Sequence, residues 1–493
     1  MKSVMPTFIP DNRFLFFVSV LVMTIVHPMI LGFDSMMVGS ILNLPSYRTF
    51  FNLTNVIMGL NTASIWIGAI LACITTTQIV SDRFGRKNAI FLSIFIIIAG
   101  VVLQSAAQNV GMFVVGRILL GFGTSVGNVA SVILVSELVP VRRRGFLMGL
   151  SFSCFLVGSL FASGITYATR NLAGNWSWRV PSIIQGAPEI IVFLNLVFIP
   201  ESPRWLIRHE RLDEATELVA LIENITLQDA HIECNELVIK LEYEAALVAG
   251  SNPWSELLTK RKNARRVWIF MTQAFLTEMA GSSVGSYYLS ILLEQAGFKN
   301  YSDRLRVNIA MSSWALAIAI FGCLCFDKLG RKKQAVISLT GMVVSFIILG
   351  NLIRRYGDGH SRGGTYSTVA FMFIFTGFYA FTYTPLTSLY PAELCPFILR
   401  STGVVAFNLM NSSWGLIAGF ILPIAMNSIG WKFYIINACY DAIFIPIIIF
   451  LWVETKGITL DDVDELFSES LLKGQDSDVR SDRSIKGIFT ETT

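Results

Sequence analysis

Charged side chains are scarce in this sequence. Asp, Glu, Lys and Arg make up 15% of its 493 residues, whereas an ordinary soluble domain has about 25%. Hydrophobic residues reach 53%, with 37 phenylalanines among them, and the mean hydropathy is +0.60. This composition is typical of a chain that lies in a lipid bilayer and does not fit a soluble globular protein.

Residues that bind metals or perform catalysis are also few. The sequence has four histidines and seven cysteines, and the cysteines lack metal-ligand spacing. Cys323 and Cys325 are two residues apart, which on a helix turns them to opposite sides. A net charge of +4 is too small to indicate a nucleic-acid partner. Because a nucleophile–base set and a phosphate loop are also missing, the sequence predicts neither an enzyme nor a bound metal or cofactor.

What the sequence has instead is a series of long apolar runs. Twelve of them are about 20 residues long, the length at which a helix crosses a hydrocarbon core of about 30 Å. They cover residues 14–39, 57–79, 88–107, 111–136, 146–169, 180–199, 266–293, 305–326, 334–353, 366–390, 401–426 and 432–452. The sequence therefore predicts an all-α membrane protein with twelve transmembrane helices.

Polar segments divide this series into parts. We predict an N-terminal segment at 1–13, a six-helix bundle at 14–199, a linker at 200–265, a second six-helix bundle at 266–452 and a tail at 453–493. The linker has an amphipathic pattern, which indicates helices with one exposed face.

Lysine and arginine are concentrated in loops on one side of the predicted membrane. These loops lie at 83–87, 142–144, 260–266 and 328–333. Because cytoplasmic loops are enriched in positive residues, we expect both termini and the linker to be cytoplasmic. Arg354, Arg355 and Arg362 fall on the opposite side, but the remaining loops outweigh them.

Two charged patterns occur twice in the chain. Residues 82–87 (DRFGRK) are repeated at 327–333 (DKLGRKK), and the spacing of Glu137 to Arg144 is repeated from Glu393 to Arg400. Matching order and spacing indicate one unit written twice. For a unit of apolar helices, this duplication is typical of a transporter whose site lies between two homologous halves.

We expect the carboxylates and arginines of these repeats to latch the halves together through charge-assisted hydrogen bonds, which break when the protein opens inward. This gating set consists of Asp82, Arg86, Glu137, Arg144, Asp327, Arg331, Glu393 and Arg400. An alternative interpretation is that the positive charges only mark one side of the membrane.

The order of several motifs resembles that of sugar porters of the major facilitator superfamily. The similarity runs from Gly32 to Gly457 and includes GFD (32–34), GR (116–117), WR (178–179), PESPRWL (200–206) and ETKG (454–457). The stretches YTPL (383–386) and YPAE (390–393) are most similar to the fungal lactose-permease and hexose-transporter branch. The resemblance implies the major facilitator fold, with two pseudo-symmetric six-helix bundles and a cytoplasmic helical insert.

The resemblance also assigns a role to two charges inside predicted spans, where ionisable groups are costly and usually functional. Asp34 and Arg117 match an acid–arginine pair of the proton-coupled family members. In those proteins, protonation of the acid releases the arginine and lets the bundles move. Proton symport is therefore expected, and a purely structural ion pair is the alternative.

The substrate contacts of the family are only partly kept. The resemblance implies a site formed by Gln185, Glu278, Ser283, Tyr287, Tyr288, Tyr390 and Asn411. Glu278 stands where the family has a glutamine; it would bind a cation, take up a proton or accept hydrogen bonds as an amide does, unless the alignment is shifted there. Phe152 and Ala315 replace a glutamine and an asparagine. Fewer hydrogen-bonding groups suit a smaller or more apolar substrate.

Two functions fit these observations. The first is a proton-coupled importer of a sugar or sugar-like molecule, acting as a monomer by alternating access in the plasma membrane of a fungus. The second is a transporter or exporter of a non-sugar small molecule, such as a secondary metabolite, on the same scaffold. In both cases the partners are a small-molecule substrate and the lipid bilayer, joined by protons in the first.

Overall fold

The fold is built from helices alone in the part of the chain that the structure describes. The computed structural model describes residues 12–75, 83–140, 147, 150–248, 253–281, 293, 300–356, 361–395, 399–456 and 467. Every regular element in these ranges is an α-helix, and ten helices there are long and apolar enough to cross a membrane. These helices fit the predicted all-α membrane protein.

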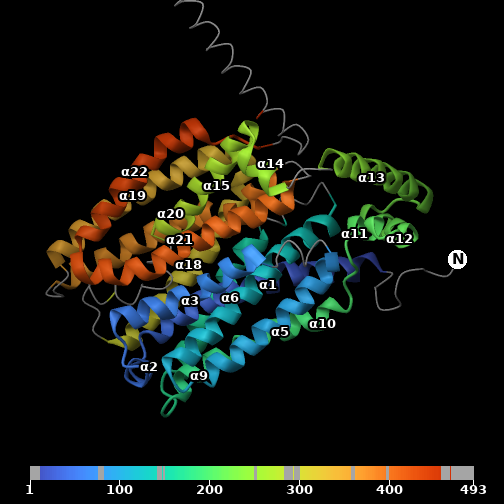
Figure 1. Cartoon of the computed structure of the whole chain (residues 1–493). Helices are drawn as coiled ribbons and strands as arrows, with labels where there is room; N and C mark the ends of the chain where they lie inside the picture. Colours follow the sequence, from blue (N-terminus) through green and yellow to red (C-terminus); the bar gives the residue numbers. More distant parts are fainter. Residues whose placement is uncertain are drawn as a thin grey trace, which may run out of the picture.

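The helices gather into two groups that follow the chain order (Figure 1). The first group is α1 (Arg13–Ile41), α3 (Asn55–Thr75), α5 (Arg86–Ser105), α6 (Val110–Leu138), α8 (Phe155–Thr169), α9 (Trp176–Ile184) and α10 (Ala187–Leu196), with the short α2 (Pro45–Phe50). The second group is α15 (Arg261–Met279), α18 (Tyr301–Leu329), α19 (Arg331–Tyr356), α20 (Arg362–Leu394), α21 (Arg400–Ile429) and α22 (Lys432–Leu451). We call these groups the N half and the C half.

The linker between the halves is helical as well. It contains α11 (Pro203–Arg208), α12 (Leu212–Glu223), α13 (Leu227–Val248) and α14 (Pro253–Thr259). In Figure 1 these green helices lie at one end of the molecule, outside the two groups of long helices. We call this the linker end.

The sixth predicted span, at 180–199, consists of two helices instead of one. α9 begins earlier, at Trp176, and ends at Ile184, and α10 begins at Ala187. Pro188 stands in the first turn of α10, where its missing N–H costs nothing, but it could not continue α9 because its ring blocks the helical hydrogen bond. The break leaves Gln185 and Gly186 between two helix ends.

The helices of each half approach one another very closely at small residues. A Cβ on Gly68 of α3 would lie 2.0 Å from the carbonyl oxygen of Ile118, and one on Gly121 of α6 would lie 1.8 Å from that of Ile65. Without a hydrophobic force between helices in lipid, such close backbone packing supplies much of their attraction. Glycine at these two positions therefore holds α3 against α6.

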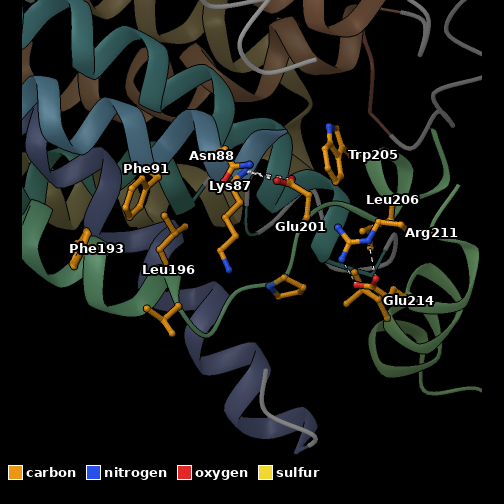
Figure 2. A pocket seen from close by; sticks show the side chains of 13 residues that line it. Lys87, Asn88, Phe91, Phe193, Leu196, Glu201, Trp205, Leu206, Arg211 and Glu214 are labelled. Carbon is orange, nitrogen blue, oxygen red and sulfur yellow. Dashed lines mark hydrogen bonds and ion pairs between the residues drawn. The ribbon is translucent and has the colours of Figure 1, made fainter. Parts of the chain in front are cut away.

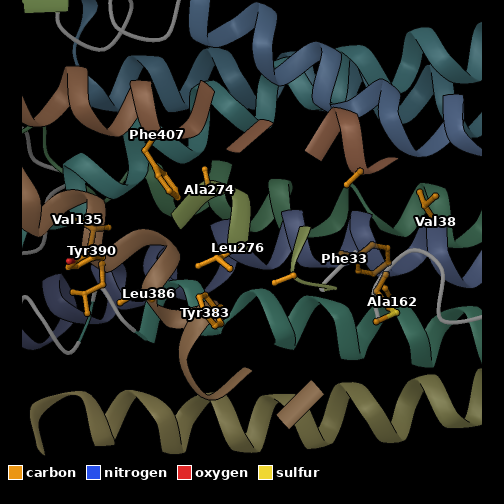
Figure 3. Packing of buried hydrophobic residues seen from close by; sticks show 14 of the residues in the cluster. Phe33, Val38, Val135, Ala162, Ala274, Leu276, Tyr383, Leu386, Tyr390 and Phe407 are labelled. Carbon is orange, nitrogen blue, oxygen red and sulfur yellow. The ribbon is translucent and has the colours of Figure 1, made fainter. Parts of the chain in front are cut away.

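Apolar side chains occupy both the interior and the outer surface. Figure 3 shows buried members of the main cluster, including Leu276 and Phe407 on helices of the C half. Other large apolar residues point outward, for example Leu194 at 59% and Phe450 at 81% exposure. An apolar exterior of this kind is suited to contact with lipid chains.

Candidate functional site

A buried ion pair joins α1 to α6 in the N half. The two terminal guanidinium nitrogens of Arg117 donate to the Asp34 carboxylate, at 2.9 Å (Nη1 to Oδ1) and 3.1 Å (Nη2 to Oδ2). Both side chains are fully buried. Two parallel hydrogen bonds between charged groups are the strongest form of this contact, and in a dry interior each charge needs the other. The structure thus brings together the two residues predicted to couple transport to protons.

Two amides extend this pair toward the interrupted sixth span. Gln185 donates from Nε2 to Asp34 Oδ1 at 2.7 Å, and Gln104 donates from Nε2 to Gln185 Oε1 at 3.3 Å. Gln185 is fully buried and reaches Asp34 from the break between α9 and α10. Gln185 is a predicted substrate contact, and its described side-chain contacts are with Asp34 and Gln104.

A cavity of about 130 Å³ lies between the two halves. The N half lines it with Leu31, Ser35, Ile65, Trp66, Ala69, Thr124, Ser125, Asn128, Phe152 and Phe155, and the C half with Thr277, Glu278, Tyr379, Thr384, Thr387, Asn408, Asn411 and Ser412. Amides, hydroxyls and one carboxylate thus share the described wall with several aromatic rings. Pockets of small-molecule proteins typically combine apolar walls with a few orienting polar groups.

The ion pair is joined to the cavity wall through α1. Ser35 lines the cavity, and the preceding residue on α1 is Asp34, whose carboxylate faces Arg117. A change in the Asp34–Arg117 contact can therefore move the helix that forms part of the cavity wall.

Glu278 and Asn411, both predicted substrate contacts, meet on the C-half wall of the cavity. Asn411 on α21 donates from Nδ2 to Glu278 Oε1 on α15 at 3.0 Å. Two further amides of the wall, Asn128 and Asn408, were missed by the motif comparison. Amide side chains in the apolar runs were the available signal, because polar groups within a membrane span are costly.

The other predicted substrate contacts lie elsewhere or outside the described residues. Tyr390 is fully buried at the end of α20, where its hydroxyl donates to Val453 O at 2.6 Å and its ring stacks on Trp452. It does not line the cavity. Ser283, Tyr287 and Tyr288 lie outside the described residues.

The duplicated charged motifs form matching clusters at the linker end of the two halves. In the N half, Arg86 on α5 pairs with Glu137 on α6 at 3.6 Å (Nε to Oε2). In the C half, Arg331 on α19 pairs with Glu393 on α20 at 2.8 Å (Nη2 to Oε1). Each of these pairs joins two helices of the same half and so ties that half together.

The latch between the halves stays a prediction. Asp82 and Arg144 lie outside the described residues, and the structure describes no side-chain contacts for Asp327 or Arg400.

Two glutamates that follow the halves complete the clusters, and we had not counted them as site residues. Glu201 accepts hydrogen bonds from the backbone N–H of Arg86 at 3.0 Å and of Lys87 at 3.0 Å. Glu454 accepts from the backbone N–H of Arg331 at 2.8 Å and of Lys332 at 3.1 Å. Each carboxylate therefore caps a helix N-terminus, where unpaired N–H groups and the helix dipole favour a negative charge.

Burial affects the proton affinity of Glu201. It raises the pKa of this carboxyl above its ordinary value, and the opposing effects of the backbone N–H groups and of the Arg86 charge are smaller. Figure 2 shows the carboxylate directed at the start of α5. A cavity of about 480 Å³ lies between the N half and the linker, and on its linker side Arg211 pairs with Glu214 at 2.6 Å (Figure 2).

Comparison with known proteins identifies the class. Residues 20–467 match the model of the family described as "Sugar (and other) transporter", and the chain therefore belongs to this family of membrane transporters. The match confirms the resemblance to the sugar porters. It also agrees with the prediction that the protein is a transporter and not an enzyme.

Two relatives illustrate the range of similarity. The chain is 29% identical over 397 residues to the MFS-type transporter oryC of Aspergillus oryzae, covering 79% of this chain and 73% of the relative. It is 25% identical over 488 residues to a low-affinity glucose transporter of Kluyveromyces lactis, covering 95% and 85%.

Solved structures match over nearly the full length. The proton:xylose symporter XylE bound to 6-bromo-6-deoxy-D-glucose superposes with a TM-score of 0.78 at 19% identity, covering 92% of this chain and all of that one. A partially occluded inward-open form of the xylose transporter XylE from E. coli gives 0.75 at 19% identity, covering 90% of this chain and all of that one. These matches establish the major facilitator fold.

Proposed function

We propose that this protein is a proton symporter that moves a sugar or sugar-like small molecule across the plasma membrane by alternating access, as a monomer with both termini in the cytoplasm. The observation that carries the proposal is the fully buried Asp34–Arg117 pair, in which Asp34 directly precedes Ser35 of the wall of a cavity between the halves. The glucose-transporting relative supports the sugar, and the neighbouring proton:xylose symporter supports the coupling.

Each part of this arrangement has a task in the proposed cycle. As a carboxylate, Asp34 holds Arg117 through two hydrogen bonds and thereby fixes α1 against α6. A proton on Asp34 removes the charge that Arg117 needs, so the contact weakens and α1 is free to move with the cavity wall. The polar groups around Glu278 and Asn411 bind the substrate, because hydroxyls taken from water must regain their hydrogen bonds.

Radiolabelled uptake in yeast that lacks hexose transport tests this function. Glucose, galactose, xylose, lactose and cellobiose are offered at acidic and neutral pH to cells that express the chain or its Asp34→Asn variant. We expect accumulation of one sugar at acidic pH and its loss in the variant, because a neutral amide neither binds the proton nor holds Arg117. Asp303→Asn, which removes an acid from an exposed ion pair with Arg306, is the matched control and should accumulate the sugar normally.

A second candidate is a transporter or exporter of a non-sugar small molecule. Phe152 on the cavity wall, at a position where the sugar porters have a glutamine, favours it, as does the similarity to an MFS-type transporter without a sugar in its name. If the protein reaches the cell surface and takes up none of the five sugars, the result would decide for this second candidate.

A further inference from the structure

A second, smaller cavity adjoins the central one. It measures about 60 Å³ and shares Phe155, Tyr379 and Thr384 with the central cavity. We call it the annex. Since a buried water needs about 10–15 Å³ of such space, the annex has room for roughly four to six water-sized groups, which is the size of one small ring.

The described wall of the annex is mostly apolar. Its own lining includes Met36 from α1, Leu156 from α8, Met311 and Ala315 from α18, and Phe375 and Ala380 from α20. Five of these six side chains are less than 9% exposed, with Leu156 half-buried. A sugar hydroxyl placed against this wall would lose its hydrogen bonds to water without regaining them, which costs about 1–3 kcal/mol.

Most hydroxyls of the annex are already engaged. Ser159 donates to Gly32 O at 3.1 Å, and Ser312 shares a hydrogen bond with Ser163 at 3.4 Å. Thr376 Oγ1 is buried and has no hydrogen-bond partner among the described residues. The annex therefore offers one spare hydroxyl at most from these three side chains, whereas the central cavity has Glu278, Asn411 and two further amides.

From this division, and resting on the proposed function, we infer that the substrate is amphipathic: a polyhydroxylated head lies in the central cavity at Glu278 and Asn411, and an aryl or short alkyl group covalently attached to it fills the annex against Ala315. A bare monosaccharide would leave the annex unfilled and would forgo the burial of apolar surface there. An aryl or alkyl glycoside is the simplest compound with both parts.

The test compares glucose with phenyl β-D-glucoside by calorimetric titration of the purified full-length protein. We expect the phenyl glucoside to bind at least about tenfold more tightly, since even one methylene in a hydrophobic pocket changes affinity by about 10-fold or more. Ala315→Phe fills the annex and should abolish this preference while glucose affinity is kept. Ala317→Phe, an identical change on the exposed side of the same helix, should retain the preference.

The outcomes of this test distinguish failure of the annex inference from failure of the proposed sugar transport. Equal affinities for the two ligands, or an equal loss of both in Ala315→Phe, would overturn the annex inference and leave the proposed sugar transport intact. If neither glucose nor phenyl glucoside bound, both the annex inference and the proposed sugar transport would be overturned. If Ala315→Phe fails to fold, Ala315→Val is used instead, because valine fills part of the same space. For the inference to stand, this variant must reduce the preference for phenyl glucoside in proportion to the space that it fills.

Discussion

Single residues carry the two activities proposed for this transporter, proton coupling and substrate binding, and their environments differ sharply. Asp34 meets a guanidinium and an amide in a fully buried position. Glu278 lies on the cavity wall, where an amide donates to it. We propose that the first carboxylate responds to a proton and the second to a ligand, because of the two only Glu278 lines the cavity.

Replacing Glu278 measures what its charge contributes to binding. Glu278→Gln keeps an acceptor oxygen but loses the charge, and hydrogen bonds to charged groups exceed neutral ones by about 1–2 kcal/mol. We expect affinity for the transported sugar to fall about tenfold. Glu278→Ala removes the acceptor as well and should reduce affinity about a hundredfold.

Titration of the sugar into the purified variants gives these affinities. Glu210→Gln, on the exposed surface of the linker, is the control and should bind like the unchanged protein. Unchanged affinity in Glu278→Ala would show that the substrate does not contact this carboxylate.

The pairing of Asp34 with Arg117 could be predicted from the sequence, whereas the hydrogen bond of Gln185 to that pair could not. Asp34 and Arg117 stand out because ionisable residues are rare within apolar runs. Gln185 could be assigned to the interior, but its contact with Asp34 could not be predicted, since its position depends on a helix break. Pro188 was the signal for that break, and it was visible in the sequence.

At the level of secondary-structure elements, the two halves have matching caps at helix N-termini. The N-termini of α5 and α19 are capped by glutamates from other parts of the chain, Glu201 and Glu454. Both caps lie where a half of the molecule ends and a polar segment begins. The final part of each half is thereby fixed to its third long helix, in the same way in both halves.

The raised pKa of Glu201 makes one cap sensitive to pH. The folded protein holds the proton on Glu201 more tightly than the unfolded chain does. In the unfolded chain the pKa of this carboxyl has its ordinary value of 4.5. Stability from this group is therefore full below pH 4.5 and declines as the pH rises through the folded pKa. Glu201→Gln, which stays neutral, should lack this decline.

Thermal unfolding in detergent at pH 4.5 and pH 7 measures the effect. We expect the melting temperature of Glu201→Gln, relative to that of the unchanged protein, to be higher at pH 7 than at pH 4.5. Glu210→Gln changes an exposed acid of the same linker and should show no such difference between the two pH values. The opposite trend for Glu201→Gln would mean that the backbone N–H groups outweigh burial.

At the scale of the whole molecule, the architecture could be predicted and the shape of the site could not. Span length and the duplicated motifs are properties of continuous segments, so they are readable from sequence. The annex is formed where Met36, Leu156, Met311 and Phe375 meet from four helices. No local sequence pattern predicts this contact between four helices, because it depends on how the two halves of the chain pack together.

The two halves should assemble from separate polypeptides. Each half has its own buried ion pair at the linker end and its own capping glutamate, so neither depends on the other for these contacts. A chain divided between Val248 and Pro253 keeps α11 and α12 with the N half. We expect the co-expressed pieces to co-purify and to recover roughly a tenth or more of uptake, a loss of about 1.4 kcal/mol or less.

Uptake by cells that express both pieces, compared with either piece alone, checks this expectation. Either piece alone should be inactive, because the cavity takes lining residues from both halves. Absence of uptake from pieces that co-purify would mean that the continuous linker is required for the transport cycle.

The glycine contacts between α3 and α6 have a mechanical consequence. At Gly68 and Gly121 the backbones of α3 and α6 are so close that sliding one helix along the other would make carbonyl oxygens of one helix clash with the other helix. The N half can therefore tilt as a solid block but cannot shear internally at this seam. A pair of fluorescent dyes on α3 and α6 would report a constant separation throughout the cycle, whereas dyes on α6 and α21 would report the rocking angle itself.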